Sequence, residues 1–204
     1  MPGVRRGRWQ GTSAGFPACH LLRDLQAARG AAVTWRPAFW LVALSVIAID
    51  QATKQWALAA LSPGEVIPVI GDYLQLQLVF NSGAAFSLGT DYTWVLTIVA
   101  VVVTAGLVYY ARRAASVPVV VLFGIGLGGA IGNLIDRLLR EPSFGEGHVI
   151  DMIKYGDLFV GNIADIAIVG AATVAVLMGL AGKPLLHPPA VGEVSSEPAK
   201  ESQE

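Results

Sequence analysis

Hydrophobic residues in this 204-residue chain gather in four stretches, each separated from the next by more polar segments. A transmembrane helix needs about 20 mostly apolar residues, and each stretch is close to that length. The stretches run from Phe39 to Leu61, Thr93 to Tyr110, Val117 to Ile135 and Ile163 to Ala181. The pattern predicts an all-α integral membrane protein with four transmembrane helices.

The connection at 62–92 has a different pattern. Apolar and polar residues alternate in Tyr73-Leu-Gln-Leu-Gln-Leu-Val-Phe80, as in a strand with one wet face. A turn of small residues, Asn81-Ser-Gly-Ala-Ala-Phe86, follows. We expect a small extracytoplasmic β-sheet between the first and second helices, able to receive an extended peptide by strand addition. A simple surface hairpin is the alternative.

The composition agrees with a membrane protein of one small domain, since 54% of the residues are hydrophobic and 14% are charged. The net charge of −1 gives no electrostatic reason to expect nucleic acid as a partner. The single cysteine, Cys19, excludes a disulfide framework and a multi-thiolate metal site.

Positive charges indicate the orientation, because cytoplasmic segments carry the excess of Lys and Arg. The 62–92 connection carries neither, and the 136–162 connection is mixed. Both termini are therefore expected in the cytoplasm. The basic residues on that side are Arg5, Arg6, Arg8, Arg23, Arg29, Arg36, Arg112, Arg113 and Lys183.

The two ends lie outside the expected membrane domain, which covers residues 37–182. Residues 1–36 form a basic cytoplasmic extension, in which His20 to Gly30 is either a short amphipathic helix or disordered. Residues 183–204 form a cytoplasmic tail that is rich in Pro, Ser and Glu, and we expect it to be disordered.

Three aspartates lie between and inside the last two apolar stretches: Asp136, Asp151 and Asp165. Carboxylates beside a membrane are costly unless they are protonated or paired, so each is a candidate functional residue. The third helix runs outward and the fourth runs back inward. This topology alone brings all three carboxylates to one depth at the outer face.

Local environment ranks the three. Asp165 lies in a first helical turn with Asn162 as its N-cap, where the helix dipole favours a negative charge. Asp151 is flanked by apolar residues, so desolvation should raise its pKa, although alone it could be a solvated loop residue. We therefore pair Asp151 with Asp165 as an acid and a base. Asp136, with Arg137 compensating its charge, has a supporting role.

Asp50 and Lys54 are four residues apart on one face of the first helix. A structural ion pair pointing into the bundle is the favoured interpretation, and a proton relay is the alternative. Glycines crowd the third helix, where small residues let helices approach closely and would hold Asn133 and Asp136 against a neighbour.

Other catalytic types do not fit. The three histidines are scattered, with no His-Glu-x-x-His for zinc. The Gly-x-Ser-x-Gly match, Gly11-Thr-Ser-Ala-Gly15, lies in the N-terminal extension, outside the expected membrane domain and without the strand before it that a serine nucleophile needs. Aspartate chemistry remains, and it requires no metal and no cofactor.

Together these motifs resemble the prolipoprotein signal peptidase family, also called signal peptidase II, from Phe39 to about Ala181. The matching motifs are Asp50-x-x-x-Lys54, Asn81-Ser-Gly-Ala-Ala-Phe86, Gly128-Gly-Ala-Ile-Gly-Asn-Leu-Ile-Asp-Arg137, Gly147-His-Val-Ile-Asp151 and Asn162-Ile-Ala-Asp165. The chain departs from the family pattern at Gly161, where Phe is usual, in an apparent insertion from Glu141 to Glu146, and in its N-terminal extension.

The resemblance implies an aspartic endopeptidase of the bacterial inner membrane, which removes signal peptides from lipoprotein precursors by cutting before a diacylglyceryl-modified cysteine. It implies Asp151 and Asp165 as the catalytic pair, and Asp50 with Lys54 as a stabilising pair. The residues implied to line or support the site are Asn81, Asn133, Asp136, Arg137 and Asn162.

Two other classes of function were weighed. A small proton- or ion-coupled transporter would use Asp50, Lys54 and Asp136 as a relay and would spread its carboxylates across the membrane depth. A scaffold protein would depend on no aspartate beyond folding.

Overall fold

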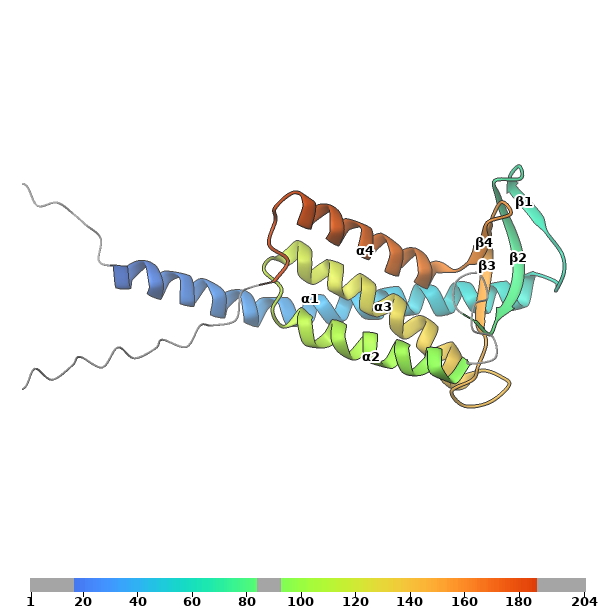
Figure 1. Cartoon of the computed structure of the whole chain (residues 1–204), viewed down its shortest axis with the longest axis horizontal. Coiled ribbons are helices and arrows are strands. Elements are labelled where there is room, and N and C mark those ends of the chain that lie inside the picture. The colour runs from blue at the N-terminus through green and yellow to red at the C-terminus, as the bar shows by residue number, and fades with distance from the viewer. Residues whose placement is uncertain (1–16, 84–92, 187–204) are drawn as a thin grey trace, which may run out of the picture.

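The computed structural model describes residues 17–83 and 93–186. Within these ranges the chain forms four helices and four strands, and Figure 1 shows the helices running alongside one another with the strands gathered at one end. The elements are α1 (Pro17–Ala60), β1 (Ile67–Ile70), β2 (Leu74–Asn81), α2 (Thr93–Ala111), α3 (Val117–Leu139), β3 (Val149–Tyr155), β4 (Phe159–Gly161) and α4 (Ile163–Leu180).

Hydrophobic length located the helices well. The helices α2, α3 and α4 begin at the predicted residues, and these three are long and apolar enough to cross a bilayer. The assignment of α1 as a fourth span remains a prediction. Its start differs from the expected one, because the helix begins at Pro17 and includes the segment from His20 to Gly30.

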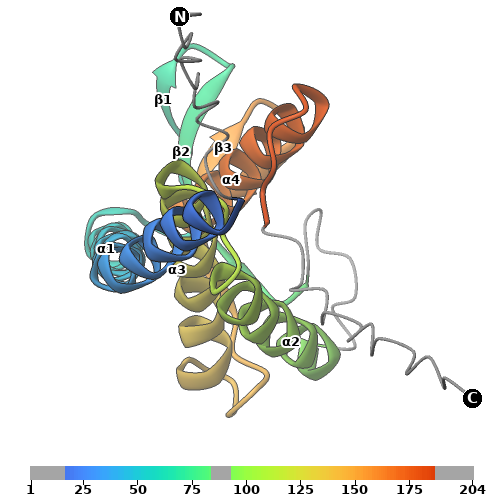
Figure 2. The same ribbon diagram turned by 90° about the vertical axis from the view of Figure 1, so that its left-hand side faces the viewer.

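Helix α3 is the centre of the bundle, and Figure 2 shows α1, α2 and α4 arranged around it. The glycines of α3 permit the close approach of these helices. A Cβ at Gly128 would lie 2.6 Å from the Val46 Cβ on α1, and one at Gly129 would lie 2.6 Å from the Ala164 carbonyl oxygen on α4. Both distances are too short for any side chain, so the expected close packing through small residues is present.

The strands form one antiparallel sheet in the order β1-β2-β3-β4. The prediction of a sheet in the connection between α1 and α2 was incomplete, because β3 and β4 come from the connection between α3 and α4. Asp151 therefore lies in a strand, opposite Val79 of β2, and not in a loop. The first four residues of β3 are all buried, so this strand has no polar face and no alternating pattern to reveal it.

Two clusters of buried apolar residues hold the molecule together. One lies within the bundle, and the other joins the end of α1 to the sheet, so the sheet is fixed relative to the helices. The second cluster consists of Ala57, Leu61, Leu78, Ile150 and Met152. At the opposite end of the bundle, the chain after α4 returns to the α2–α3 connection, where the Ala115 N–H donates to the Leu185 carbonyl at 3.0 Å.

Candidate active site

A cavity of about 330 Å³ lies where the bundle meets the sheet. Five of the seven residues predicted for the site line it, and α3, α4 and the inner strands supply them. The lining residues are Asn81, Gly83, Asn133, Arg137, Val149, Asp151, Phe159, Val160, Asp165, Ile168 and Val169. Of the other two predicted residues, Asn162 lies beside the cavity and contacts its carboxylates, and Asp136 lies behind it.

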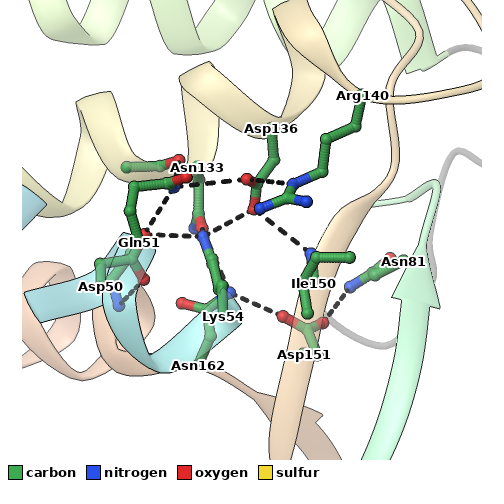
Figure 3. A network of polar contacts seen from close by, with 12 residues as sticks. Asp50, Gln51, Lys54, Asn81, Asn133, Asp136, Arg140, Ile150, Asp151 and Asn162 are labelled. Carbon is green, nitrogen blue, oxygen red and sulfur yellow. Dashed lines mark hydrogen bonds and ion pairs between the residues drawn. The ribbon is translucent and has the colours of Figure 1, made fainter. Parts of the chain in front are cut away.

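Asp151 is buried, with 1% of its surface exposed. Its Oδ1 accepts a hydrogen bond from Asn162 Nδ2 at 2.6 Å, and its Oδ2 accepts one from Asn81 Nδ2 at 2.9 Å (Figure 3). Burial and then the negative charge of Asp165 raise the pKa of Asp151 to about 7, while the two amide donors and Lys54 oppose the shift. The expected raised pKa is confirmed.

Asp165 is held by the start of α4. The Asn162 Oδ1 accepts from the Asp165 N–H at 2.9 Å, and the Asp165 Oδ2 accepts from the Asn162 N–H at 3.1 Å, which together form a capping box. The predicted N-cap is therefore correct. A third bond reaches from α3, because Asn133 Nδ2 donates to Asp165 Oδ1 at 2.9 Å. The carboxyl group is half-buried, so burial acts on its charge as well as the dipole at the helix N-terminus.

Asn162 joins the two carboxyl groups. Its side-chain amide donates to Asp151, while its backbone N–H donates to Asp165. The tertiary structure thus brings both carboxyl groups to one cavity and one asparagine, and the charge of Asp165 acts on Asp151. A carboxyl group with a raised pKa beside a second carboxyl group can work as an acid and a base.

Lys54 fixes the direction of the amide hydrogen bonds. Its ammonium group can only donate, and it donates to Asn133 Oδ1 at 2.9 Å. The Asn133 Nδ2 is therefore left to face Asp165. At the other end, the Asp165 N–H occupies Asn162 Oδ1, so Asn162 Nδ2 must donate to Asp151 and to Asn133. Lys54 and the Asp165 N–H can only donate, so they turn the amide N–H groups of Asn133 and Asn162 toward the two carboxylates.

Asp136 is fully buried and does not line the cavity. It pairs with Lys54 at 2.7 Å and Arg140 at 2.6 Å, and it accepts a bond from the Ile150 N–H at 3.3 Å (Figure 3). Arg137, which we expected to compensate this charge, attracts Asp136 electrostatically but forms no ion pair with it. Adjacent residues of a helix point in different directions, whereas Arg140 is four residues away on the same face. Asp136 ties α1 and α3 to the residue that precedes Asp151.

Arg137 lines the cavity instead. Its Nη2 donates to the Gly83 carbonyl at 2.6 Å, and its buried Nη1 has no hydrogen-bond partner within residues 17–83 and 93–186. A buried donor without a partner costs free energy and is available to an acceptor on a ligand. Arg137 therefore offers the cavity an N–H group near the carboxylates.

The Asp50–Lys54 ion pair lies inside the bundle as expected, at 2.8 Å with both side chains fully buried. Asp50 Oδ1 also accepts from the Ala164 N–H at 3.0 Å, which links α1 to the start of α4 beside Asp165. A Cβ at Gly132 would lie 2.5 Å from the Asp50 carboxylate, so this glycine makes room for the pair.

Sequence reasoning missed Gln51 and Arg140. Gln51 Nε2 lies within 3.3 Å of Asp136 Oδ1, and no sequence pattern relates residues on separate helices. Arg140 could have been found, since it follows Asp136 by four residues in the same helix.

Asn81 is fixed by its own turn. Its Oδ1 accepts from the Gly83 N–H at 2.9 Å, so its Nδ2 is directed to Asp151. The rest of its motif, residues 84–86, lies outside the described residues.

The departure at Gly161 has a structural reason. A Cβ at Gly161 would lie 3.0 Å from Asp165 Oδ2 and 3.2 Å from the Phe159 ring. The Phe159 ring lines the cavity and stacks on Tyr155, with ring centroids 4.8 Å apart. In this chain the aromatic ring that lines the cavity beside the carboxylates is that of Phe159.

Comparison with known proteins finds similarity over the membrane region. The signal peptidase (SPase) II family model matches residues 42–181. The lipoprotein signal peptidase of Mycobacterium avium (strain 104) is 45% identical over 141 residues, which cover 69% of this chain and 78% of that protein. The lipoprotein signal peptidase of Leifsonia xyli subsp. xyli (strain CTCB07) is 46% identical over 143 residues, covering 70% of this chain and 66% of that protein.

Two solved structures, each described as a bacterial membrane enzyme, have the same fold. One superposes with a TM-score of 0.63 at 25% identity, covering 75% of this chain and 95% of that one. The other has a TM-score of 0.61 at 26% identity, covering 71% of this chain and 94% of that one.

Proposed function

The chain belongs to the signal peptidase II family, and from that premise we propose that it removes signal peptides from lipid-modified prolipoproteins by aspartic protease chemistry. The family match and the curated relatives support the peptidase activity on prolipoproteins. The identity of the catalytic residues rests on one observation: Asp151 and Asp165 line a single cavity and are bridged by Asn162.

The mechanism follows from the different settings of the two carboxyl groups. Asp151, with a pKa of about 7, holds a proton in a large part of the molecules near neutral pH and hydrogen-bonds the scissile carbonyl oxygen. Ionised Asp165 accepts a proton from a water that attacks the carbonyl carbon. That proton then passes to the leaving amine as the peptide bond breaks. Because the two groups are coupled, the dyad titrates as a unit and the roles can exchange.

The other polar residues position the substrate and the dyad. The Arg137 Nη1, which has no partner among the residues that the structure describes, donates to a substrate carbonyl, since it is a buried donor at the cavity wall. Asn81 and Asn162 hold Asp151, and Asn133 holds Asp165. Asp136, Asp50 and Lys54 stabilise this arrangement from behind the cavity.

The membrane orientation is part of the proposal. Four helices span the bacterial inner membrane with both termini in the cytoplasm, and the sheet and the dyad lie at the extracytoplasmic face. The basic residues before α1 and between α2 and α3 support this orientation. The substrate is a precursor that carries a diacylglyceryl-modified cysteine, and it enters laterally from the lipid.

The transporter alternative is not supported. The curated relatives are peptidases, and Asp50, Lys54 and Asp136 form a closed and fully buried ion cluster. A relay needs groups spread along a path, and the other two acids of this region lie at the same end of the bundle as the cluster.

The test uses the purified full-length protein in lipid with a diacylglyceryl-modified precursor, and it measures the released signal peptide. Asp151→Asn and Asp165→Asn should each lower cleavage by about a hundredfold or more, because each removes one half of the acid–base pair. Asp157→Asn is the matched control, since Asp157 is fully exposed on the β3–β4 turn and should retain full activity. Full activity of Asp151→Asn would refute the assignment.

A further inference from the structure

A second cavity, of about 280 Å³, lies on α3 between α2 and α4, and we call it the inner cavity. It is open at the surface of the bundle, since its lining residue Val103 is 49% exposed. Its wall is almost entirely apolar, whereas the cavity that holds the two carboxyl groups is lined by both polar and apolar side chains. The residues that line it are Val103, Leu107, Val119, Leu122, Phe123, Gly126, Ala130, Ile168, Ala171, Ala172, Ala175 and Leu185.

The two cavities lie along the same pair of helix faces. Residues three and four apart share one face of a helix. The shared face of α3 carries Gly126, Ala130, Asn133 and Arg137, and the shared face of α4 carries Ala175, Ala172, Ile168 and Asp165. On both helices the apolar members line the inner cavity and the polar members lie at the site, while Ile168 lines both cavities. The inner cavity is thus the apolar continuation of the catalytic cavity.

The inner cavity is long and narrow. Its lining on α3 extends from Val119 to Ala130, which at 1.5 Å per residue is about 16 Å. A helix about 10 Å in diameter would fill about 1,300 Å³ over that length, which is several times the volume of the cavity. The cavity is therefore too small for the signal helix of a precursor, and its length suits an extended hydrocarbon chain.

We propose that this cavity binds one acyl chain of the substrate's diacylglyceryl group, and this inference rests on the proposed function. Cleavage before the modified cysteine places the lipid-bearing side chain next to the scissile bond, inside the catalytic cavity. From there an acyl chain has an apolar path past Ile168 toward Ala172 and Ala175, with Leu185 at the inner end. The chain thereby helps to set the scissile carbonyl against Asp151.

The test narrows the cavity at two depths. Along α4, Ala172 lies about 10 Å from Asp165 and Ala175 about 15 Å from it. Ala172→Leu and Ala175→Leu are compared with Thr173→Leu, which places the same side chain at a neighbouring position of α4 that lines neither cavity. The substrates are one precursor peptide carrying diacylglyceryl groups with butyryl, lauroyl or palmitoyl chains, and kcat and KM are measured for each.

The wild-type protein should cleave the palmitoyl substrate best. Ala172→Leu should lower kcat/KM by about tenfold or more for both long chains while leaving the butyryl substrate unchanged. Ala175→Leu should lower kcat/KM chiefly for the palmitoyl substrate, because the new leucine side chain lies farther from Asp165, where only the longest chain reaches. Thr173→Leu should change none of them.

Three outcomes would overturn the inference. Equal losses for all chain lengths would indicate that the signal helix or the fold is affected instead of an acyl site. No loss for any substrate would show that the cavity is not used, and the reverse depth order would exclude the proposed path. Failure of the proposed function would appear separately, as no cleavage of any lipidated precursor by the wild-type protein.

Discussion

Single residues in this site gain their properties from partners that are far away in the sequence. Lys54 is 79 positions before Asn133, yet its ammonium group decides which end of that amide faces Asp165. Asp151 owes its raised pKa first to burial and then to Asp165. The chemistry of each carboxyl group is therefore a property of the assembled site.

The pH dependence of activity should follow the proton on Asp151. The neutral form hydrogen-bonds the substrate carbonyl in our mechanism, and the pKa is about 7. We therefore expect kcat/KM to fall as the pH rises through this value. The profile is measured with one lipidated precursor in one lipid mixture, and an alkaline limb that stays flat to pH 9 would contradict the role of a protonated Asp151.

The pH dependence of the free energy of unfolding provides a second test of the proton on Asp151. The folded state binds this proton more tightly than the unfolded state, whose aspartate has an ordinary pKa of 3.8. The free energy of unfolding of the wild type should therefore fall, relative to that of Asp151→Asn, as the pH rises from about 4 to 7, and the difference should level off above 7.

At the scale of elements, the start of α4 has two tasks. Asn162 caps the helix through its Oδ1 and bridges to Asp151 through its Nδ2. The cap stabilises the helix by about 0.5–2 kcal/mol, as such residues commonly do. The bridge orients one carboxyl group relative to the other.

Substitutions of Asn162 should separate the two tasks. Asn162→Ala should lower both stability and activity, because it removes the cap and the bridge. Asn162→Ser keeps an oxygen that can cap the helix but loses the amide donor, so its melting temperature should lie above that of Asn162→Ala while kcat/KM still falls by about tenfold or more. Full activity of Asn162→Ser would show that the bridge to Asp151 is not needed.

At the scale of the whole molecule, the site depends on how closely the helices approach α3. Gly128 and Gly129 set the spacing to α1 and α4, and these helices supply Lys54 and Asp165. A wider spacing would separate Lys54 from Asn133, and Asn133 from Asp165. The geometry of the carboxylates therefore depends on the close packing that these glycines allow.

Gly128→Ala should therefore destabilise the protein by about 1–3 kcal/mol, because the new methyl group meets Val46 and the Ala43 carbonyl oxygen. Gly179→Ala is the control within a helix, since no atom lies within 4 Å of its Cβ position. Thermal unfolding in detergent measures both, and equal melting temperatures of the two variants would refute the packing argument.

The sequence by itself determined the apolar helices, the existence of a small sheet and the placing of three aspartates near one end of the bundle. These follow from short-range properties: the length of an apolar run, the alternation in β2, and a topology that returns the chain to the same face. The N-cap at Asn162 and the ion pair between Asp50 and Lys54 are likewise local, since each joins residues one helical turn apart.

Only the tertiary structure decided how these parts are joined. Strands from two separate connections form one sheet, which removes Asp151 from water, and β3 gave no alternating pattern because its first four residues are all buried. Arg140 and Lys54, and not Arg137, form the ion pairs with Asp136, because the direction of a side chain from a helix is fixed by its position in the turn. The apolar cavity that shares Ile168 with the candidate site also depends on the spacing of three helices. Burial and charge act through space, so they are settled only when the chain has folded.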